Sequence, residues 1–270
     1  MNGLVNPWRR WWLFALSGLI VVFLIVPVLI IIPMSFSASR YLDFPPTSFS
    51  LQWYERLFGP GDWWPALVVS LKLATLTALL SAPLGVAVSY AVHHAKWRFI
   101  KRLETMMLLP LMVPHIIVAV GIFYGYVHFK LLGSFWALLA ANVMLALPFV
   151  VVSTSAGLRT FDDTQELVAR IMGCSRLRAF LSVTLPQIRG SVITGMLFAF
   201  VSALDEVIVA ILVSTGRSVT VTKVMFDSLR DEIDPTITAV STLMILASLI
   251  GLGLTLWLQS LNSRRAGQGA

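Results

Sequence analysis

Two adjacent carboxylates, Asp205 and Glu206, lie inside a long apolar segment and are the residues best suited to chemistry. At a helical rise of about 1.5 Å per residue, they lie roughly 20 Å into that segment. A carboxylate inside a bilayer costs about 2.5–3.5 kcal/mol on insertion scales, so it should face water or a polar partner. We expect either that Asp205, Glu206 and nearby Ser202 line the route of a cationic solute, or that the acids pair with Lys72 or with a neighbouring subunit.

The other chemically capable residues form no catalytic or metal-binding pattern. His115 and His128 fall on nearly opposite faces of one predicted helix, and His93 and His94 lie at a helix boundary. Cys174 is the single cysteine, which excludes a disulfide framework and a thiolate metal site. The sequence has no Gly-x-x-x-x-Gly-Lys-Ser/Thr loop to hold nucleotide phosphates. We therefore expect no cofactor and no metal, and any ATP that drives this protein must bind to a partner.

The amino-acid composition indicates which kind of secondary structure holds these polar residues in place. The chain has 270 residues, of which 57% are hydrophobic and 12% charged, and this balance is too apolar for a water-soluble domain. The segments long enough to cross a bilayer as helices are 12–32, 66–92, 103–127, 132–155, 191–213 and 236–258. The sequence therefore predicts an all-α, polytopic membrane protein with six transmembrane helices in a single domain, residues 1–270. The first segment is too long for a signal peptide, so we expect it to be retained.

The distribution of basic residues predicts the orientation. Most loop lysines and arginines fall on one side: Arg9, Arg10, Lys96, Arg98, Lys101, Arg102, the arginines of residues 159–189, Arg264 and Arg265. By the positive-inside rule, both termini and the loop 159–189 are cytoplasmic, as in a multi-pass protein of a bacterial inner membrane. The net charge of +7 then reflects this topology and attraction to membrane lipid, and requires no nucleic-acid partner.

The loop 159–189 predicts two short amphipathic helices at the membrane surface. Asp163 can cap a first helix with Glu166 at its third position, and Gly173 can end it in a left-handed conformation. The apolar residues of that helix share one face: Leu167, Val168, Ile171 and Met172. Ser175 can cap a second helix, which extends to Thr184 and carries Leu177, Phe180 and Leu181 on its apolar face. Such a rigid protrusion can bind a soluble partner, and the alternative is a solvated loop of no special use.

The loop resembles a known signature. Gly173, followed by Leu185 and by Pro186 at the predicted start of the next membrane helix, resembles the cytoplasmic loop of permease subunits of type I ATP-binding-cassette importers. That pattern is roughly Glu-Ala-Ala, three residues, Gly, then a hydrophobic stretch ending in Leu-Pro. In this register the family's glutamate falls on Leu167, and Glu166 lies one residue early. The resemblance implies that the residues coupling to the ATPase are Glu166, Ala169, Gly173, Leu185 and Pro186.

Two further segments are similar to polyamine-type (spermidine/putrescine) permeases of this family. Residues 198–207 read Phe-Ala-Phe-Val-Ser-Ala-Leu-Asp-Glu-Val, where those permeases carry a Ser-Leu/Met-Asp-Asp-like motif. Residues 44–54, Phe-Pro-Pro-Thr-Ser-Phe-Ser-Leu-Gln-Trp-Tyr, resemble their outer loop. The resemblance implies a permease that imports a polyamine or related amino compound and catalyses no reaction itself. It also implies a second permease subunit, two ATP-binding subunits and a periplasmic solute-binding protein.

Other interpretations remain open at this point. An ion-coupled secondary transporter could use Asp205 or Glu206 as a proton or sodium relay, although the sequence shows no internal repeat typical of many such carriers. A membrane-embedded enzyme would need convergent His, Asp or Cys clusters, which are not evident. Between the last two predicted spans lies an acidic cluster: Asp227, Asp231, Glu232 and Asp234. It is either a solvated loop or a contact surface for the periplasmic binding protein.

Overall fold

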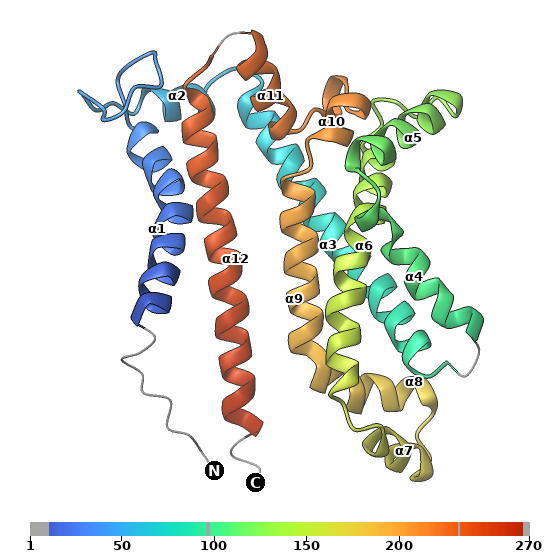
Figure 1. The fold of residues 1–270 in the computed structure, drawn as a ribbon. Coiled ribbons are helices and arrows are strands. Elements are labelled where there is room, and N and C mark those ends of the chain that lie inside the picture. Colours follow the sequence, from blue (N-terminus) through green and yellow to red (C-terminus); the bar gives the residue numbers. More distant parts are fainter. Residues whose placement is uncertain (1–10, 96–97, 232, 267–270) are drawn as a thin grey trace. The chain divides into compact units, whose positions relative to one another are not determined.

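The computed structural model describes residues 11–95, 98–231 and 233–266, and helices dominate this part of the chain (Figure 1). The predicted Arg9, Arg10, Lys96 and Glu232 therefore lie outside the described residues. The chain forms two compact units, Met1–Gly61 with Ser228–Leu246, and Asp62–Asp227 with Ala247–Ala270. The single permease domain over residues 1–270 stays a prediction.

The first unit contains α1 (Trp11–Met34), α2 (Gln52–Phe58) and the start of α12 (Thr236–Ala266). The loop between α1 and α2 is fixed to α2 by side chains that donate to its carbonyls. The Trp53 indole donates to Ser37 O at 2.7 Å, and the Gln52 amide donates to Ala38 O at 2.9 Å. This part of the segment 44–54 is therefore an ordered structure rather than a loose linker.

Asp234, two residues before α12, caps the start of that helix within the same unit. Its Oδ1 accepts from the backbone N and the hydroxyl of Thr236, at 3.0 and 2.7 Å, and its Oδ2 lies 3.2 Å from the Arg56 guanidinium. One member of the predicted acidic cluster is thus a helix-capping residue, because it satisfies a backbone N–H that has no partner within the helix.

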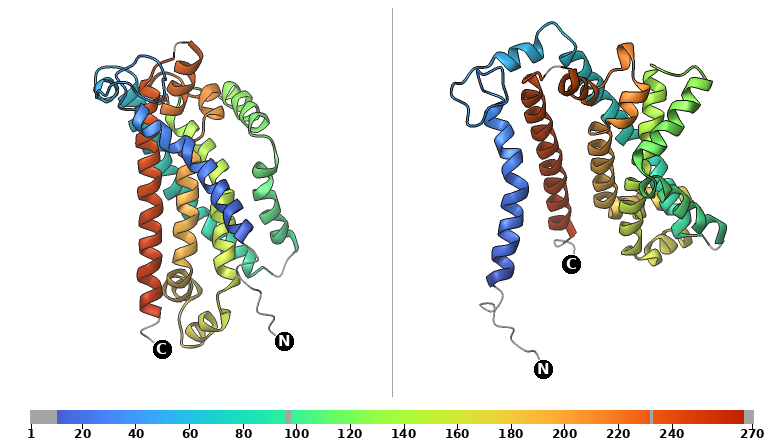
Figure 2. Two further views of the ribbon diagram at one scale, coloured as in Figure 1. Left: turned by 60° about the vertical axis from the view of Figure 1, so that its left-hand side comes forward. Right: turned by 45° about the horizontal axis from the view of Figure 1, so that its top comes forward.

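The second unit is built on α3 (Trp63–His93), α6 (Phe135–Arg159) and α9 (Leu185–Leu204), which lie side by side in Figures 1 and 2. Small residues allow these helices to approach closely. A Cβ at Gly85 would lie 2.5 Å from Val150 Cγ1, and a Cβ at Gly157 would lie 2.5 Å from Ser191 Oγ. Ser89 adds a hydrogen bond to the carbonyl of Val151 at 3.1 Å. These contacts make the three helices a firm core.

The predicted span 103–127 is two helices and not one. Helix α4 (Arg98–Met112) and α5 (His115–His128) meet at a bend of 106°. Pro114 lies at the bend with φ −53° and ψ 129°. A proline lacks the N–H for helical hydrogen bonding and disfavours helical geometry at the residue before it, which explains the break.

The predicted span 191–213 is also interrupted. Helix α9 ends at Leu204, and α10 (Ile208–Val213) begins after three residues that include both acids. Glu206 accepts a hydrogen bond from Val209 N at 2.9 Å, so its side chain replaces a backbone acceptor at the start of α10. The chain then continues through a short 3₁₀ turn, Gly216–Ser218, to α11 (Val221–Asp231).

The predicted all-α, multi-span fold is confirmed. Among the described residues, α1, α3, α6 and the helical stretch Arg176–Leu204 are long and apolar enough to cross a membrane. The bent pair α4–α5 supplies a fifth crossing if it counts as one span. Helix α12 covers the remaining predicted span, and its residues Thr236–Gly251 form an apolar helix.

Candidate functional site

Helices α7 (Asp163–Ile171) and α8 (Arg176–Ala179) project beyond the ends of α6 and α9 (Figures 1 and 2). The cap of α7 is Asp162, one residue earlier than predicted, and its carboxylate accepts from Thr164 N at 3.0 Å. Hydrogen bonds from the side chain and backbone of Thr164 hold the pKa of Asp162 below its usual value. Asp163 is free of the capping role and lies 3.0 Å from His93 Nε2 on α3.

Gly173 ends this helix in a left-handed conformation, with φ +94°, as predicted. Its neighbours close the turn, because Gly173 N donates to Arg170 O and Cys174 N donates to Ala169 O, both at 3.1 Å. No atom outside the turn lies within 4 Å of where a Cβ would be, so space is not the reason for glycine here. The backbone conformation is the reason, because φ values in this range strain every residue that has a Cβ.

Glu166 faces inward and not toward a partner. Its side chain is buried, with the residue only 3% exposed. One carboxylate oxygen accepts from the Tyr90 hydroxyl on α3, and the other accepts from the Thr184 hydroxyl, each at 2.5 Å. Sequence reasoning missed Tyr90 and Thr184. The available signal was the spacing of Tyr90 and His93, which puts both on the face of α3 that meets α7.

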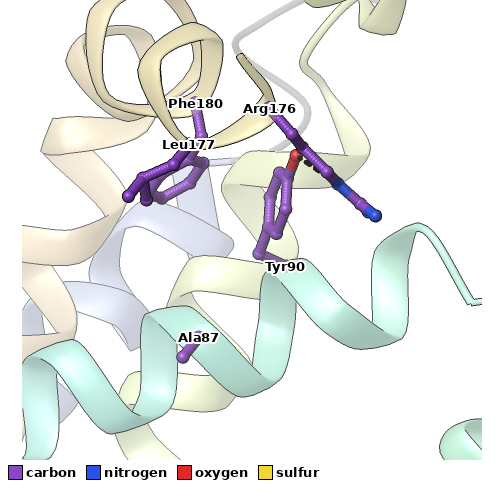
Figure 3. Close-up of a pocket in the computed structure, with 5 residues that line it drawn as sticks. All are labelled: Ala87, Tyr90, Arg176, Leu177 and Phe180. Carbon is purple, nitrogen blue, oxygen red and sulfur yellow. Dashed lines mark hydrogen bonds between the residues drawn. The ribbon is translucent and has the colours of Figure 1, made fainter.

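Arg176 is packed against Tyr90 beside a small hollow (Figure 3). Its Nε donates to the Tyr90 hydroxyl at 3.4 Å, and its guanidinium carbon lies 5.4 Å from the ring centroid. The hollow has a volume of about 380 Å³ and is lined by Ala87, Tyr90, Arg176, Leu177 and Phe180. The phenyl ring of Phe180 lies 4.6 Å from that of Tyr90, centroid to centroid, so α3 and the second short helix are in direct contact.

The second predicted helix, residues 175–184, does not stop before Pro186. Ser175 caps it as predicted, accepting from Arg178 N at 3.4 Å. A π-helical segment, η2 (Phe180–Thr184), then joins α8 to α9. Leu185 N donates to Phe180 O in this segment, which shifts the hydrogen-bond register by one residue. The shift explains how the helix continues through Pro186, which has no N–H of its own.

An apolar surface remains open on these two short helices. The predicted face of α7 is exposed, with Ile171 76% and Met172 81% accessible, and Leu177 on α8 is 68% accessible. We call the exposed residues of this surface the α7–α8 apolar patch: Leu167, Val168, Ile171, Met172, Leu177 and Leu181. Exposed apolar side chains gathered on two neighbouring short helices are typical of an interaction site.

The two acids of the predicted path have different surroundings. Glu206 is 8% exposed, and besides Val209 N its carboxylate faces His115, with 3.6 Å between Oε2 and Nδ1. Asp205 is exposed at the end of α9, and Ser202 is half-buried one turn earlier. Within the described part of the chain the basic side chain that contacts the Glu206 carboxylate is His115 and not Lys72. That Asp205, Glu206 and Ser202 line a solute path stays a prediction.

A single span over residues 103–127, as the sequence predicts, gives no reason to pair His115 with Glu206. The bend at Pro114 places the start of α5 against α10, and with it His115 against Glu206. Helix α11 supports the same region, since Thr222 Oγ1 donates to Glu206 O at 3.1 Å and Lys223 Nζ donates to Ser214 O at 2.6 Å. Across the residues that the structure describes, no three potential metal ligands come together in one group.

The fold defines a class: a multi-span membrane protein with two short helices that project on one side. Residues 81–268 match the family described as binding-protein-dependent transport system inner membrane component, and the chain belongs to this family. It is therefore a multi-pass inner-membrane protein that works with a solute-binding protein, and the ion-coupled carrier is not favoured.

Curated relatives agree with this assignment. The chain is 29% identical over 227 residues to the spermidine/putrescine transport system permease protein PotC of Haemophilus influenzae, covering 84% of this chain and 88% of that one. It is 29% identical over 250 residues to the putrescine transport system permease protein PotI of Escherichia coli K12, covering 89% and 86%. The predicted resemblance to polyamine-type permeases is confirmed.

A solved structure shares the fold. A bacterial alginate ABC transporter, crystallised in complex with its alginate pentasaccharide-bound periplasmic protein, matches with a TM-score of 0.68 at 17% identity, covering 98% of both chains. At this identity the likeness establishes the fold alone. The predicted ABC importer permease fold is confirmed.

Proposed function

We propose that this chain forms one half of the translocation pore of an ATP-driven importer that carries a polyamine or a related amino compound. The other components are a second permease subunit, two ATP-binding subunits on the cytoplasmic side and a periplasmic solute-binding protein. Both termini and the α7–α8 loop face the cytoplasm, an orientation supported by the basic residues of that loop. ATP is hydrolysed by the partner subunits and not by this chain.

The observation that carries the proposal is the α7–α8 apolar patch, which is exposed on helices that are themselves firmly held. Capping at Asp162 and Ser175, the turn at Gly173 and the burial of Glu166 fix the shape of the loop. A rigid apolar protrusion can fill a groove on a soluble subunit and move with it. The residues proposed to couple this motion are Glu166, Ala169, Gly173, Leu185 and Pro186.

The substrate class rests on the acids and on the names of the relatives. A protonated amine is attracted to carboxylates, and Asp205 is an exposed carboxylate beside a break in a membrane helix. Glu206 adds a second acid, and the side chain of its neighbour His115 is 44% exposed, so the imidazole has room to move away from the carboxylate. The relatives named above are permeases for spermidine and putrescine or for putrescine.

The test is transport by the purified assembly in proteoliposomes. Uptake of radiolabelled putrescine should require three things: the two ATPase subunits in the assembly, ATP inside the vesicles, and the solute-binding protein outside them. An imposed proton or sodium gradient, with no ATP, should give no uptake. Uptake driven by such a gradient alone would contradict the proposal and support the ion-coupled carrier.

A further inference from the structure

We infer that Glu166 is a positioning residue that ties α7 to α3 through Tyr90, and that it does not contact the ATPase. The inference rests on the proposed function, because it concerns how motion of the proposed docking loop, residues 159–189, reaches the membrane helices. Its basis is a buried contact between residues far apart in the sequence: Glu166 on α7, Tyr90 on α3 and Thr184 in η2.

The carboxylate of Glu166 is already satisfied inside this chain. Its two oxygens each accept a hydroxyl hydrogen bond, and the residue is 3% exposed. A partner protein could reach this carboxylate only by breaking one of those bonds and opening the loop. Hydrogen bonds to an ionised acceptor are about twice as strong as neutral ones, so such an opening is unfavourable.

The Tyr90 hydroxyl takes part in two hydrogen bonds of opposite direction. A carboxylate can only accept, so the hydroxyl donates its hydrogen to Glu166, and its oxygen accepts from Arg176 Nε. Figure 3 shows the Arg176 side chain passing beside the Tyr90 hydroxyl, with the hydrogen bond between them drawn as a dashed line. Tyr90 therefore joins both short helices, α7 through Glu166 and α8 through Arg176, to the end of α3.

A second contact prevents α7 from pivoting about Glu166. Asp163 lies three residues before Glu166, and His93 lies three residues after Tyr90, so the two pairs are one helical turn apart on the same pair of faces. Helix α3 is in turn packed tightly on α6 through Gly85 and Ser89, and it also packs on α9. A displacement of α7 is thus delivered to the core through side chains, and not only along the backbone past Gly173.

The test compares variants of the complete transporter in proteoliposomes, with radiolabelled putrescine as the probe. Tyr90→Phe removes one hydroxyl and keeps the ring, and Glu166→Ala removes the carboxylate. The matched control is Gln187→Ala, which removes an exposed hydrogen bond between α9 and Gln165 on α7 and leaves Glu166 buried. We expect Tyr90→Phe and Glu166→Ala to raise the ATP hydrolysed per putrescine imported by about tenfold, as loss of a buried charged hydrogen bond implies. The control should match the native chain, and the ATPase subunits should co-purify with all three variants.

A distance measurement separates coupling from simple loss of structure. Spin labels are attached to cysteines introduced at two exposed positions, Ala91 on α3 and Arg170 on α7, in a Cys174→Ser background. The distance between the two labels should be the same with and without bound ATP. In the Tyr90→Phe background the separation should change on ATP binding, because α7 then moves without α3. The inference would be overturned if both variants kept the native ratio of ATP hydrolysed to putrescine imported. It would also be overturned if the ATPase subunits failed to co-purify with Glu166→Ala while Tyr90→Phe behaved like the native chain. Failure of the native chain to bind any ATPase would instead refute the proposed function.

Discussion

Gly173 and Glu166 show how single residues set the shape of the docking loop. Glu166 lies one residue before the position where related permeases have their glutamate, and this offset turns its carboxylate into the protein, toward Tyr90 and Thr184. Gly173 permits the reversal between the two short helices because its φ is +94°. Neither residue belongs to the α7–α8 apolar patch, so both residues affect the position of the patch and not its composition.

Replacing Gly173 with valine should uncouple transport from ATP hydrolysis. A β-branched residue at positive φ costs at least about 1–2 kcal/mol, so the turn should open or shift. We expect Gly173→Val to insert and assemble but to import far less putrescine per ATP, while Gly173→Asn, which tolerates positive φ better, retains more activity. Uptake and ATP hydrolysis measured in the same proteoliposomes provide the check. Full transport by the valine variant would show that this turn does not transmit the motion.

The two acids of the proposed path should respond differently to neutralisation. Asp205 is exposed, so Asp205→Asn should lower uptake of putrescine and leave the yield of the complex unchanged. Glu206 also accepts from Val209 N, so Glu206→Ala, which removes this acceptor together with the charge, should lower both uptake and yield, since a lost helix cap costs about 1 kcal/mol. Uptake and complex yield are measured side by side. Normal uptake by Asp205→Asn would remove that residue from the path, and a reduced yield would make it structural.

At the scale of elements, two predicted membrane helices are broken, and the breaks meet. The bend between α4 and α5 brings His115 to Glu206, at the interruption between α9 and α10. Breaks of this kind are tolerated in membrane proteins where neighbouring protein groups satisfy the freed backbone. Here Glu206 accepts from Val209 N, and α11 holds the region through Thr222.

The bend depends on Pro114. Substitution with alanine restores an N–H and releases Val113 from its restriction, so α4 and α5 should become straighter. We expect Pro114→Ala to lengthen the distance between spin labels placed on α4 and α5 and to reduce uptake severalfold, because His115 leaves Glu206. Pro110 lies inside α4, and Pro110→Ala serves as the control that should leave the bend intact. An unchanged distance in Pro114→Ala would show that packing, and not proline, sets the bend.

At the scale of the whole molecule, this chain is a part that requires others. Helix α1 has no buried residue within the described structure, and the α7–α8 apolar patch is exposed. Lipid can cover a membrane helix, and an exposed apolar patch on short projecting helices is typical of an interaction site. The chain belongs to a family of binding-protein-dependent permeases, and the patch is the surface that we propose for the ATP-binding subunits.

The purified chain alone should neither bind nor hydrolyse ATP, because its sequence has no phosphate-binding loop. Equilibrium binding of a labelled ATP analogue and phosphate release provide the measurement, with the assembled transporter as the positive control. Nucleotide turnover by the isolated chain above the level of a buffer blank would contradict the assignment of hydrolysis to partner subunits.

The sequence by itself determined the class of fold, the approximate extent of most membrane helices, the two short helices of the docking loop and the left-handed turn at Gly173. These features follow from local properties: apolar length, helical periodicity, capping residues and the conformational freedom of glycine. Tertiary structure alone decided that Glu166 points inward to Tyr90 and that His115 faces Glu206. Each of these depends on which distant helix supplies the partner side chain. Helical periodicity predicts which residues share a face of a helix, but it does not predict which other helix packs against that face.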